Sequence, residues 1–313
     1  PLASVIEHDY LRSWACGIGC RKPFPGFHPG VYREQRGLGP GVDPLVDFIR
    51  AGQPAGPWSL EVITATDEVA APDAGARVAL HVHVYYPDML PDILARLAAN
   101  AVRPDLYISV PNKAAMAMVE PLLAGYGGTV AQVQVVPNRG RDIGPFLTAF
   151  GADWSRYEVV GHLHTKKSLE LNDSAFAFRW NGFLMDNLLG RGHRMADAAV
   201  GRLLADPALG LVFPDDPNAV GWSGNLEFGR ELGERMGLAT FPSEFSFPIG
   251  TMFWARTAAI APLMGLGLQW DDYPVEPLGY DGTMLHAIER LFPSVVASRG
   301  FRCAVTHVPG VTR

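Results

Sequence analysis

The stretches VALHVHVYY (78–86), LYISV (106–110) and VAQVQVV (130–136) decide the fold of this chain. Each run is short, apolar and rich in β-branched residues, as is typical of a strand. The segments 91–100 and 113–124 lie between them and have the apolar spacing of helices. Strands that alternate with helices in this way predict βαβ units, and therefore an α/β fold with a mainly parallel sheet. A further strand is predicted at YEVVGHLH (157–164).

The first 64 residues have a different character, because Gly, Pro and aromatic residues interrupt them at short intervals. We predict that residues 1–64 form a small module of loops and short helices. One such helix is expected over 43–51, with Asp43 as its N-cap and Pro44 at its first position. Residues 65–76 are predicted to be a linker, and residues 77–313 the main domain.

The composition limits the classes of protein to consider. Hydrophobic residues make up 48% and charged residues 19% of the 313 residues, which predicts an ordinary globular chain. The formal net charge of −6 disfavours nucleic acid as a partner. Three cysteines, Cys16, Cys20 and Cys303, are too few for a disulfide scaffold. The C-x3-C spacing of the first two lacks the second ligand pair of a structural zinc site.

Neither a signal peptide nor a transmembrane segment is predicted. Charged residues such as Glu7 and Asp9 interrupt the N-terminal apolar residues, and Arg256 lies inside the longest apolar stretch, 248–268. We therefore expect a cytoplasmic protein. The chain begins at Pro1 rather than at Met, which leaves open that other domains of a longer polypeptide are among its partners.

The segment NRGRDIGPF (138–146) follows the third predicted strand. In parallel α/β sheets, ligands bind at the carboxyl ends of the strands. Arg139 and Arg141 suit phosphate groups, but either could instead pair with Asp142 in a buried turn. The residues alone leave both interpretations open.

The segment HLHTKKS (162–168) ends the next strand. His162 and His164 are two residues apart and so lie on the same face of that strand. They could bind a divalent metal, or they could hydrogen-bond a sugar or a phosphate. Lys166 and Lys167 could neutralise a diphosphate leaving group. The alternative is an exposed basic turn beside buried histidines.

The segment EPLGYDGTMLHAIER (276–290) places Glu276 and Asp281 in a loop before a helix. A carboxylate in such a place is either the helix N-cap or a general base that removes a proton from an acceptor hydroxyl. His286, Glu289 and Arg290 fall in the first turns of the predicted helix.

Together, PNRGRDIGPF, HLHTKKS, FPIGTMFWAR and DGTMLHAIER resemble, in the same order, the rhamnan synthesis F family over about residues 78–308. The resemblance implies a GT-A-like, Rossmann-type glycosyltransferase that donates a sugar from a sugar nucleotide, such as dTDP-L-rhamnose, to a growing bacterial surface polysaccharide. The segment 44–58, with Tyr32 ahead of it, resembles a short module of multidomain bacterial polysaccharide enzymes.

The resemblance also implies roles for particular residues. The nucleotide and donor site would contain His83, Tyr85, Asn138, Arg139, Arg141 and Asp142. His162 and His164 would occupy the place of the D-x-D motif, Gly250 and Thr251 would form the glycine loop, Glu276 or Asp281 would be the base, and His307 would be a late histidine that assists a metal.

The H-x-H sequence departs from D-x-D, since it lacks the carboxylates that Mg²⁺ and Mn²⁺ prefer. We therefore favour a reaction without a metal, in which Lys166 and Lys167 stabilise the departing diphosphate. If Mn²⁺ or Mg²⁺ is used, the candidate ligands are His162, His164 and His307.

The expected reaction is an inverting transfer. Asp281 or Glu276 would deprotonate a hydroxyl of a glycan or lipid-linked glycan acceptor at the inner face of the cytoplasmic membrane. Met252, Phe253 and Trp254 would shape the sugar pocket. Two alternatives stay open: a transferase for a GDP- or UDP-sugar, and a non-catalytic glycan-binding module of a larger assembly enzyme.

Overall fold

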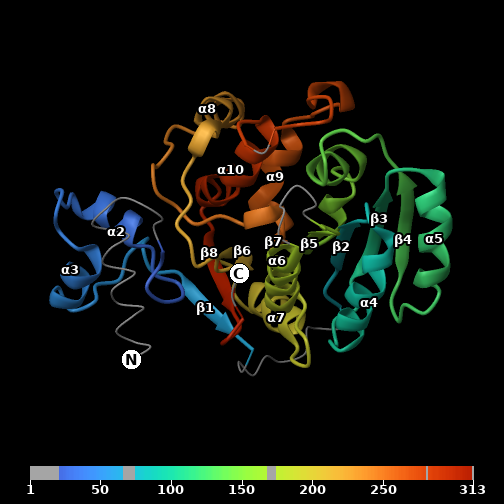
Figure 1. The fold of residues 1–313 in the computed structure, drawn as a ribbon, viewed down its shortest axis with the longest axis horizontal. Coiled ribbons are helices and arrows are strands. Elements are labelled where there is room, and N and C mark those ends of the chain that lie inside the picture. The colour runs from blue at the N-terminus through green and yellow to red at the C-terminus, as the bar shows by residue number, and fades with distance from the viewer. Residues whose placement is uncertain (1–20, 66–74, 168–173, 280, 312–313) are drawn as a thin grey trace.

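The computed structural model describes residues 21–65, 75–167, 174–279 and 281–311. In these residues eight strands form one sheet in the order β1-β8-β6-β7-β5-β2-β3-β4 (Figure 1). The strands are β1 (Glu61–Thr64), β2 (Val78–His83), β3 (Asp105–Val110), β4 (Val130–Val135), β5 (Val159–His164), β6 (Leu209–Pro214), β7 (Phe253–Arg256) and β8 (Arg302–His307). Strand β7 is antiparallel to both of its neighbours, and the other pairings are parallel. The prediction of an α/β fold with a mainly parallel sheet is confirmed.

The helices of the described residues are α2 (Pro29–Arg36), α3 (Pro44–Arg50), α4 (Leu90–Ala98), α5 (Lys113–Leu123), α6 (Ser174–Leu188), α7 (Met195–Ala205), α8 (Leu226–Arg235), α9 (Thr257–Gly265) and α10 (Met284–Ser298). Helices α4 to α10 lie on the two faces of this sheet, and α2 and α3 lie beside it. Short turns are η1 (Pro87–Met89), η2 (Pro145–Ala149, a π-helical turn), η3 (Trp154–Arg156), η4 (Ser223–Asn225), η5 (Ile249–Thr251) and η6 (Trp270–Asp272). No helix in the described residues is long and apolar enough to cross a membrane.

Two apolar cores enclose the sheet, one on each face. Helices α4 to α7 pack on one face, where they meet Leu80 and Val82 of β2. Helices α8 to α10 and the turn η2 cover the other face, where Ala79 of β2 is buried. The alternation along β2 is the period of two expected for a strand, and burial on both faces explains its nearly continuous apolar sequence.

A small separate core holds the N-terminal helices α2 and α3 together, at the left of Figure 1. It consists of Phe27, Tyr32, Phe48 and Trp58, all less than 10% exposed. Asp43 accepts hydrogen bonds from the first turn of α3, at 2.8 Å from the Leu45 nitrogen, so the predicted N-cap is confirmed.

The predicted module of residues 1–64 ends in a strand of the main sheet. Strand β1 pairs in parallel with β8, with Thr64 opposite His307. Most of the predicted linker lies outside the described residues, as do Cys16, Cys20, Glu7 and Asp9. The division at 64 and 76 therefore stays a prediction.

The antiparallel direction of β7 decides which loop reaches the site. Strands β2 and β5 end at one edge of the sheet, and β7 begins there because it runs the opposite way. The turn η5 thus lies beside the ends of the two parallel strands. The expectation that Met252, Phe253 and Trp254 shape a sugar pocket is wrong, because all three are 0% exposed in the core.

Gly161 in the middle of β5 offers a test of this packing. A Cβ there would lie 2.6 Å from the Trp254 ring and 2.7 Å from Leu80. Overpacking of this kind costs about 1–3 kcal/mol, so Gly161→Ala should lower the free energy of unfolding by that amount in urea titrations. A Cβ on Gly182 in α6 would meet no atom within 4 Å. Gly182→Ala should stabilise the protein by up to about 1 kcal/mol, and equal stabilities of the two variants would contradict this account.

Candidate active site

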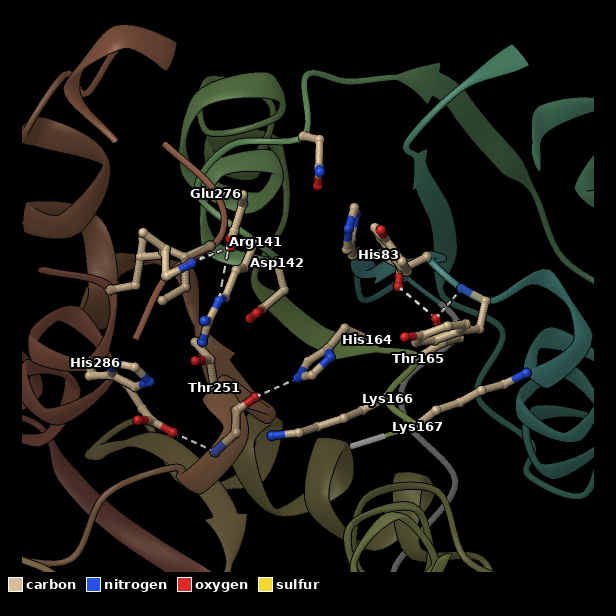
Figure 2. Close-up of a pocket in the computed structure, with 18 of the residues that line it drawn as sticks. His83, Arg141, Asp142, His164, Thr165, Lys166, Lys167, Thr251, Glu276 and His286 are labelled. Atoms are coloured by element: carbon tan, nitrogen blue, oxygen red, sulfur yellow. Dashed lines mark hydrogen bonds and ion pairs between the residues drawn. The ribbon is translucent and has the colours of Figure 1, made fainter. Parts of the chain in front are cut away.

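A cavity of about 450 Å³ opens where β2 and β5 end (Figure 2). It collects most of the residues predicted for the site from five separate segments of the chain. Those in its wall are His83, Tyr85, Asn138, Arg141, Asp142, His164, Lys166, Lys167, Gly250, Thr251 and Glu276. This placement agrees with the prediction that ligand-binding groups gather at the carboxyl edge of the parallel strands.

The remaining predicted residues lie elsewhere. Arg139 reaches away from the cavity and pairs with Asp271, at 2.6 Å between Nη1 and Oδ1. His162 is 0% exposed and lies beneath the cavity rather than in its wall. His307 pairs with Thr64 at the β1–β8 edge and is not in the cavity wall.

Three cations line the cavity, but they are held differently. The Arg141 Nε lies 3.4 Å from a Glu276 oxygen. The Lys166 ammonium lies 4.2 Å from the centre of the Trp180 ring. Lys167 forms an ion pair with Asp88 at 2.7 Å. Figure 2 shows the two lysines pointing in opposite directions, with Lys166 reaching toward Thr251. Arg141 and Lys166 are therefore the cations best placed for an anionic ligand.

The Gly250–Thr251 turn has an unusual backbone. Gly250 has φ 72° and Thr251 has φ 55°, a left-handed conformation that is costly for a β-branched residue. Two hydrogen bonds fix it. The Gly250 N–H donates to Glu289 at 2.5 Å, and the His164 Nε2–H donates to the Gly250 carbonyl at 2.9 Å. Backbone strain of this kind is concentrated at functional sites, and Arg141, with φ 49°, shares it.

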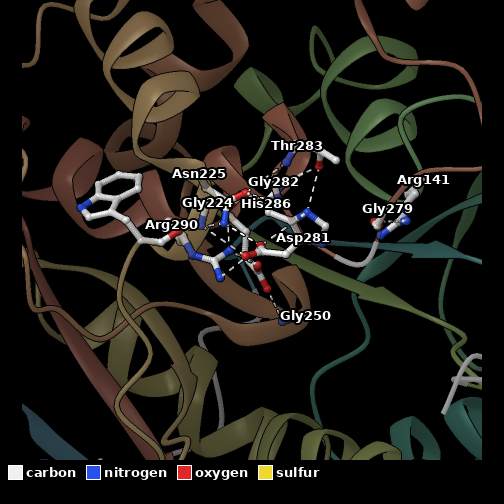
Figure 3. A network of polar contacts seen from close by, with 12 residues as sticks. Arg141, Gly224, Asn225, Gly250, Gly279, Asp281, Gly282, Thr283, His286 and Arg290 are labelled. Atoms are coloured by element: carbon white, nitrogen blue, oxygen red, sulfur yellow. Dashed lines mark hydrogen bonds and ion pairs between the residues drawn. The ribbon is translucent and has the colours of Figure 1, made fainter. Parts of the chain in front are cut away.

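The two carboxylates predicted as alternative bases lie in different cavities. Glu276 lines the cavity described above, and it also accepts the Leu278 N–H at 2.9 Å. Asp281 lines an adjoining cavity of about 300 Å³. There it accepts a hydrogen bond from the Asn225 amide at 2.6 Å (Figure 3). The N-cap of α10 is Thr283 and not Asp281.

The surroundings of Asp281 stabilise its charged form. Burial acts to raise its pKa, but the hydrogen bond from Asn225, those from the Gly224 and Gly282 backbone, and the charge of Arg290 outweigh it and lower the pKa. A carboxylate held in this way is a weaker base than an ordinary one.

Glu289 is a member of the site for which the sequence predicted no role. Glu289 is 8% exposed and contributes to the walls of both cavities. Burial raises its pKa to about 7, although the charge of Arg290 opposes this. The sequence does contain a signal for it, because His286 and Glu289 are three residues apart and so share one face of α10.

In the described residues, no group of three or more His, Cys, Asp or Glu side chains is placed to hold a metal ion. Both ring nitrogens of His162 are within hydrogen-bonding distance of protein atoms, 3.1 Å from Asp142 and 2.9 Å from His81. His307 lies apart from both His162 and His164. The structure therefore does not bring together the three histidines predicted as metal ligands.

The raised pKa of Glu289 should make stability depend on pH. The carboxyl loses its proton near pH 4.5 in the unfolded chain but near pH 7 in the folded one, so its contribution to stability is present below 4.5 and is lost as the pH rises through 7. The wild type should lose roughly 3 kcal/mol over this range through this group. Glu289→Gln should lack that loss in urea unfolding between pH 4.5 and 8, and parallel pH curves would contradict the assignment.

Comparison with known proteins agrees with the resemblance seen in the sequence. A family model described as rhamnan synthesis protein F matches residues 46–301. The protein WxcX from two strains of Xanthomonas campestris pv. campestris is 30% identical over 258 residues, which are 81% of this chain and 36% of WxcX. The chain thus spans about a third of the length of these curated relatives. The family indicates a role in polysaccharide biosynthesis, and since its match covers most of the sequence, the chain belongs to the rhamnan synthesis protein F family.

Proposed function

We propose that this chain is a glycosyltransferase that moves a sugar from a sugar nucleotide to a growing bacterial surface glycan. The observation that carries the proposal is one cavity in which Arg141 and Lys166 face Glu276 at the carboxyl edge of a parallel sheet. Such an edge is where α/β proteins bind ligands. The combination of cations with a carboxylate suits a reaction that releases a diphosphate and removes a proton.

The proposed donor is dTDP-L-rhamnose, in keeping with the family's part in rhamnan synthesis. Arg141 offers a planar fork that can bind two phosphate oxygens, and Lys166 adds a second charge. The glycine at position 250 lets the backbone approach the donor closely. In this proposal the side-chain cations neutralise the leaving diphosphate, the task that a divalent ion performs in other transferases.

The proposed base is Glu276. Its carboxylate takes the proton of an acceptor hydroxyl, and the acceptor oxygen attacks the anomeric carbon from the face opposite the nucleotide. The bond from that carbon to the diphosphate breaks, the diphosphate keeps the electron pair, and the anomeric configuration inverts. Arg141 and Lys166 line the cavities of both carboxylates. Glu276 is preferred to Asp281 because the Asn225 amide, the Gly224 and Gly282 backbone and Arg290 stabilise the charged form of Asp281, which makes it a weaker base. The fold is proposed to work as a GT-A-type scaffold.

Binding of the donor can be tested by calorimetry with dTDP, UDP and GDP and their sugar conjugates. Lys166→Met keeps the apolar part of the side chain and removes the charge. It should weaken binding about 10- to 100-fold, because a hydrogen bond to a charged group contributes about 1.5–3 kcal/mol. Lys167→Met should cost less, since Asp88 already pairs with that lysine at 2.7 Å. Exposed Lys113→Met is the control.

The same titrations, repeated with Mn²⁺ or EDTA, address the metal. Binding unaffected by either would agree with a cradle of side-chain cations. Binding that needs Mn²⁺ would overturn it and return His162 and His164 to the role of candidate ligands. A chain that binds no nucleotide at all would instead be the glycan-binding module of a larger enzyme.

The base can be tested by a pair of isosteric variants, Glu276→Gln and Asp281→Asn. General base catalysis contributes about 10²–10⁴ in rate, so Glu276→Gln should lower turnover by that factor while it leaves donor affinity nearly unchanged. Asp281→Asn should have a much smaller effect. The opposite ranking would assign the base to Asp281, and two variants with wild-type turnover would refute both assignments.

A further inference from the structure

Directly beneath the cavity, polar side chains from adjacent strands are packed against one another. The parallel register of β2 and β5 places His81 opposite His162 and His83 opposite His164. All four imidazoles lie on the face that α9, α10 and η2 cover, where His81 and His162 are 0% exposed. Ser109 of β3, also 0% exposed, lies next to them. Buried polar groups of this kind must satisfy one another's hydrogen bonds.

These groups form one continuous hydrogen-bonded chain. The first link joins Asp142 Oδ2 to His162 Nε2 at 3.1 Å, and the second joins His162 Nδ1 to His81 Nδ1 at 2.9 Å. The third joins His81 Nε2 to the Ser109 hydroxyl, and the fourth joins that hydroxyl to His83 Nδ1, each at 2.8 Å. Both ends of the chain, Asp142 and His83, line the cavity.

With Asp142 ionised and the three imidazoles neutral, the number of protons sets the direction of every link. An ionised Asp142 can only accept, so His162 donates from Nε2. A neutral imidazole has one N–H, so the Nδ1 of His162 accepts from the Nδ1–H of His81. The Nε2 of His81 then accepts the Ser109 proton. Because Ser109 has a single proton, its oxygen accepts from the Nδ1–H of His83, whose Nε2 is left with a lone pair.

The environment supports these protonation states. Burial lowers the pKa of His83 to about 4 and that of His81 well below its ordinary value. Burial acts to raise the pKa of Asp142, but the nearby His164 and the hydrogen bond from His162 outweigh it, so the pKa is lowered. His164 is not a link of the chain, since it donates to the Gly250 carbonyl.

We propose that the chain from Asp142 fixes the tautomer of His83, so that His83 presents an unprotonated Nε2 to the cavity and binds a hydrogen-bond donor of the ligand. This rests on the proposed function for the identity of the ligand. The donor is either a hydroxyl of the sugar or a ring N–H of the base. A lone pair at Nε2 repels phosphate oxygens, so the diphosphate lies toward Arg141 and Lys166 instead.

Asp142 is a positioning residue in this proposal. If the Asp142 carboxyl were protonated, it would donate to His162, and every hydrogen bond of the chain would reverse its direction. His83 would then carry its proton on Nε2, and Nε2 would become a donor. Asp142→Asn should act in the same sense, because an amide can donate to His162 where a carboxylate cannot. The loss of an aspartate charge behind a histidine is known to produce the wrong tautomer in serine proteases.

The tautomer can be measured in the ligand-free protein by ¹⁵N NMR of labelled histidines at neutral pH. In the wild type His83 should carry its proton on Nδ1. Ser109→Ala removes the last two links and should give a mixture of tautomers, whereas Ser298→Ala, which loses a hydroxyl at the end of α10, should not. If Ser109→Ala fails to fold, Asp142→Asn provides the same readout. The proposal would be overturned by a proton on His83 Nε2 in the wild type, or by a His83 signal that neither Ser109→Ala nor Asp142→Asn changes.

Calorimetry then identifies the donor group that His83 binds. His83→Phe keeps a ring but loses the acceptor, and should weaken binding of dTDP-L-rhamnose about 2- to 10-fold, the effect of one neutral hydrogen bond. If His83→Phe weakens the binding of dTDP equally, but not the binding of dTDP methylated at N3, then His83 binds the ring N–H of the base. A loss confined to the sugar conjugate would identify a sugar hydroxyl.

The outcomes separate this inference from the proposed function. Unchanged affinity of His83→Phe for both dTDP and dTDP-L-rhamnose would refute the role of His83 while leaving sugar-nucleotide binding intact. Absence of nucleotide binding by the wild type would count against the proposed function, and the ¹⁵N measurement would still decide the tautomer.

Discussion

The hydrogen-bonded ladder around β5 is the constraint on which the rest of the site depends. On one side β5 pairs in parallel with β2, and on the other it pairs in antiparallel with β7. The parallel pairing brings two strand ends, and the polar segments that follow them, to one edge of the sheet. The antiparallel pairing brings the beginning of β7, and with it Gly250, to that same edge. A sheet with β7 parallel would place this turn at the opposite edge, far from Lys166 and His164.

The hydrogen-bonded chain of polar side chains beneath the cavity depends on the same pairing of strands. Burying a polar group without a partner costs several kcal/mol, yet His81, Ser109 and His162 are fully buried in an otherwise apolar layer. Each is satisfied by its neighbours in the chain. A network of this kind specifies one arrangement, because removing any member leaves another unpaired. The sheet register therefore fixes the packing of the core and the partners in the chain from which the tautomer of His83 is inferred.

Much of the fold could be predicted from the sequence, because local patterns determine it. The β-branched runs predict the strands, and Asp43 with Pro44 predicts the start of α3. The direction of β7 could not be predicted, since it depends on tertiary pairing and a four-residue strand has no periodicity to indicate it. His81 is not among the predicted site residues, although it stands two residues before His83, the same spacing as the H-x-H sequence of β5. Glu289 lies on the helix that the sequence predicts, but its environment depends on segments distant in sequence.

The shape of the cavity and its charge are coupled through a single residue, Gly250. Glu289 accepts the N–H of Gly250 and His164 donates to its carbonyl, so titratable groups hold the strained turn from both sides. Asp142, on the same cavity wall, keeps its charge, whereas burial brings the pKa of Glu289 to about 7. Two carboxyls with pKa values driven apart in one site can take different roles. A ligand that brings negative charge near Glu289 favours the protonated carboxyl, which weakens the hydrogen bond that fixes Gly250 and Thr251. Under the proposed function, the charge of the donor and the backbone conformation of this turn would therefore be linked.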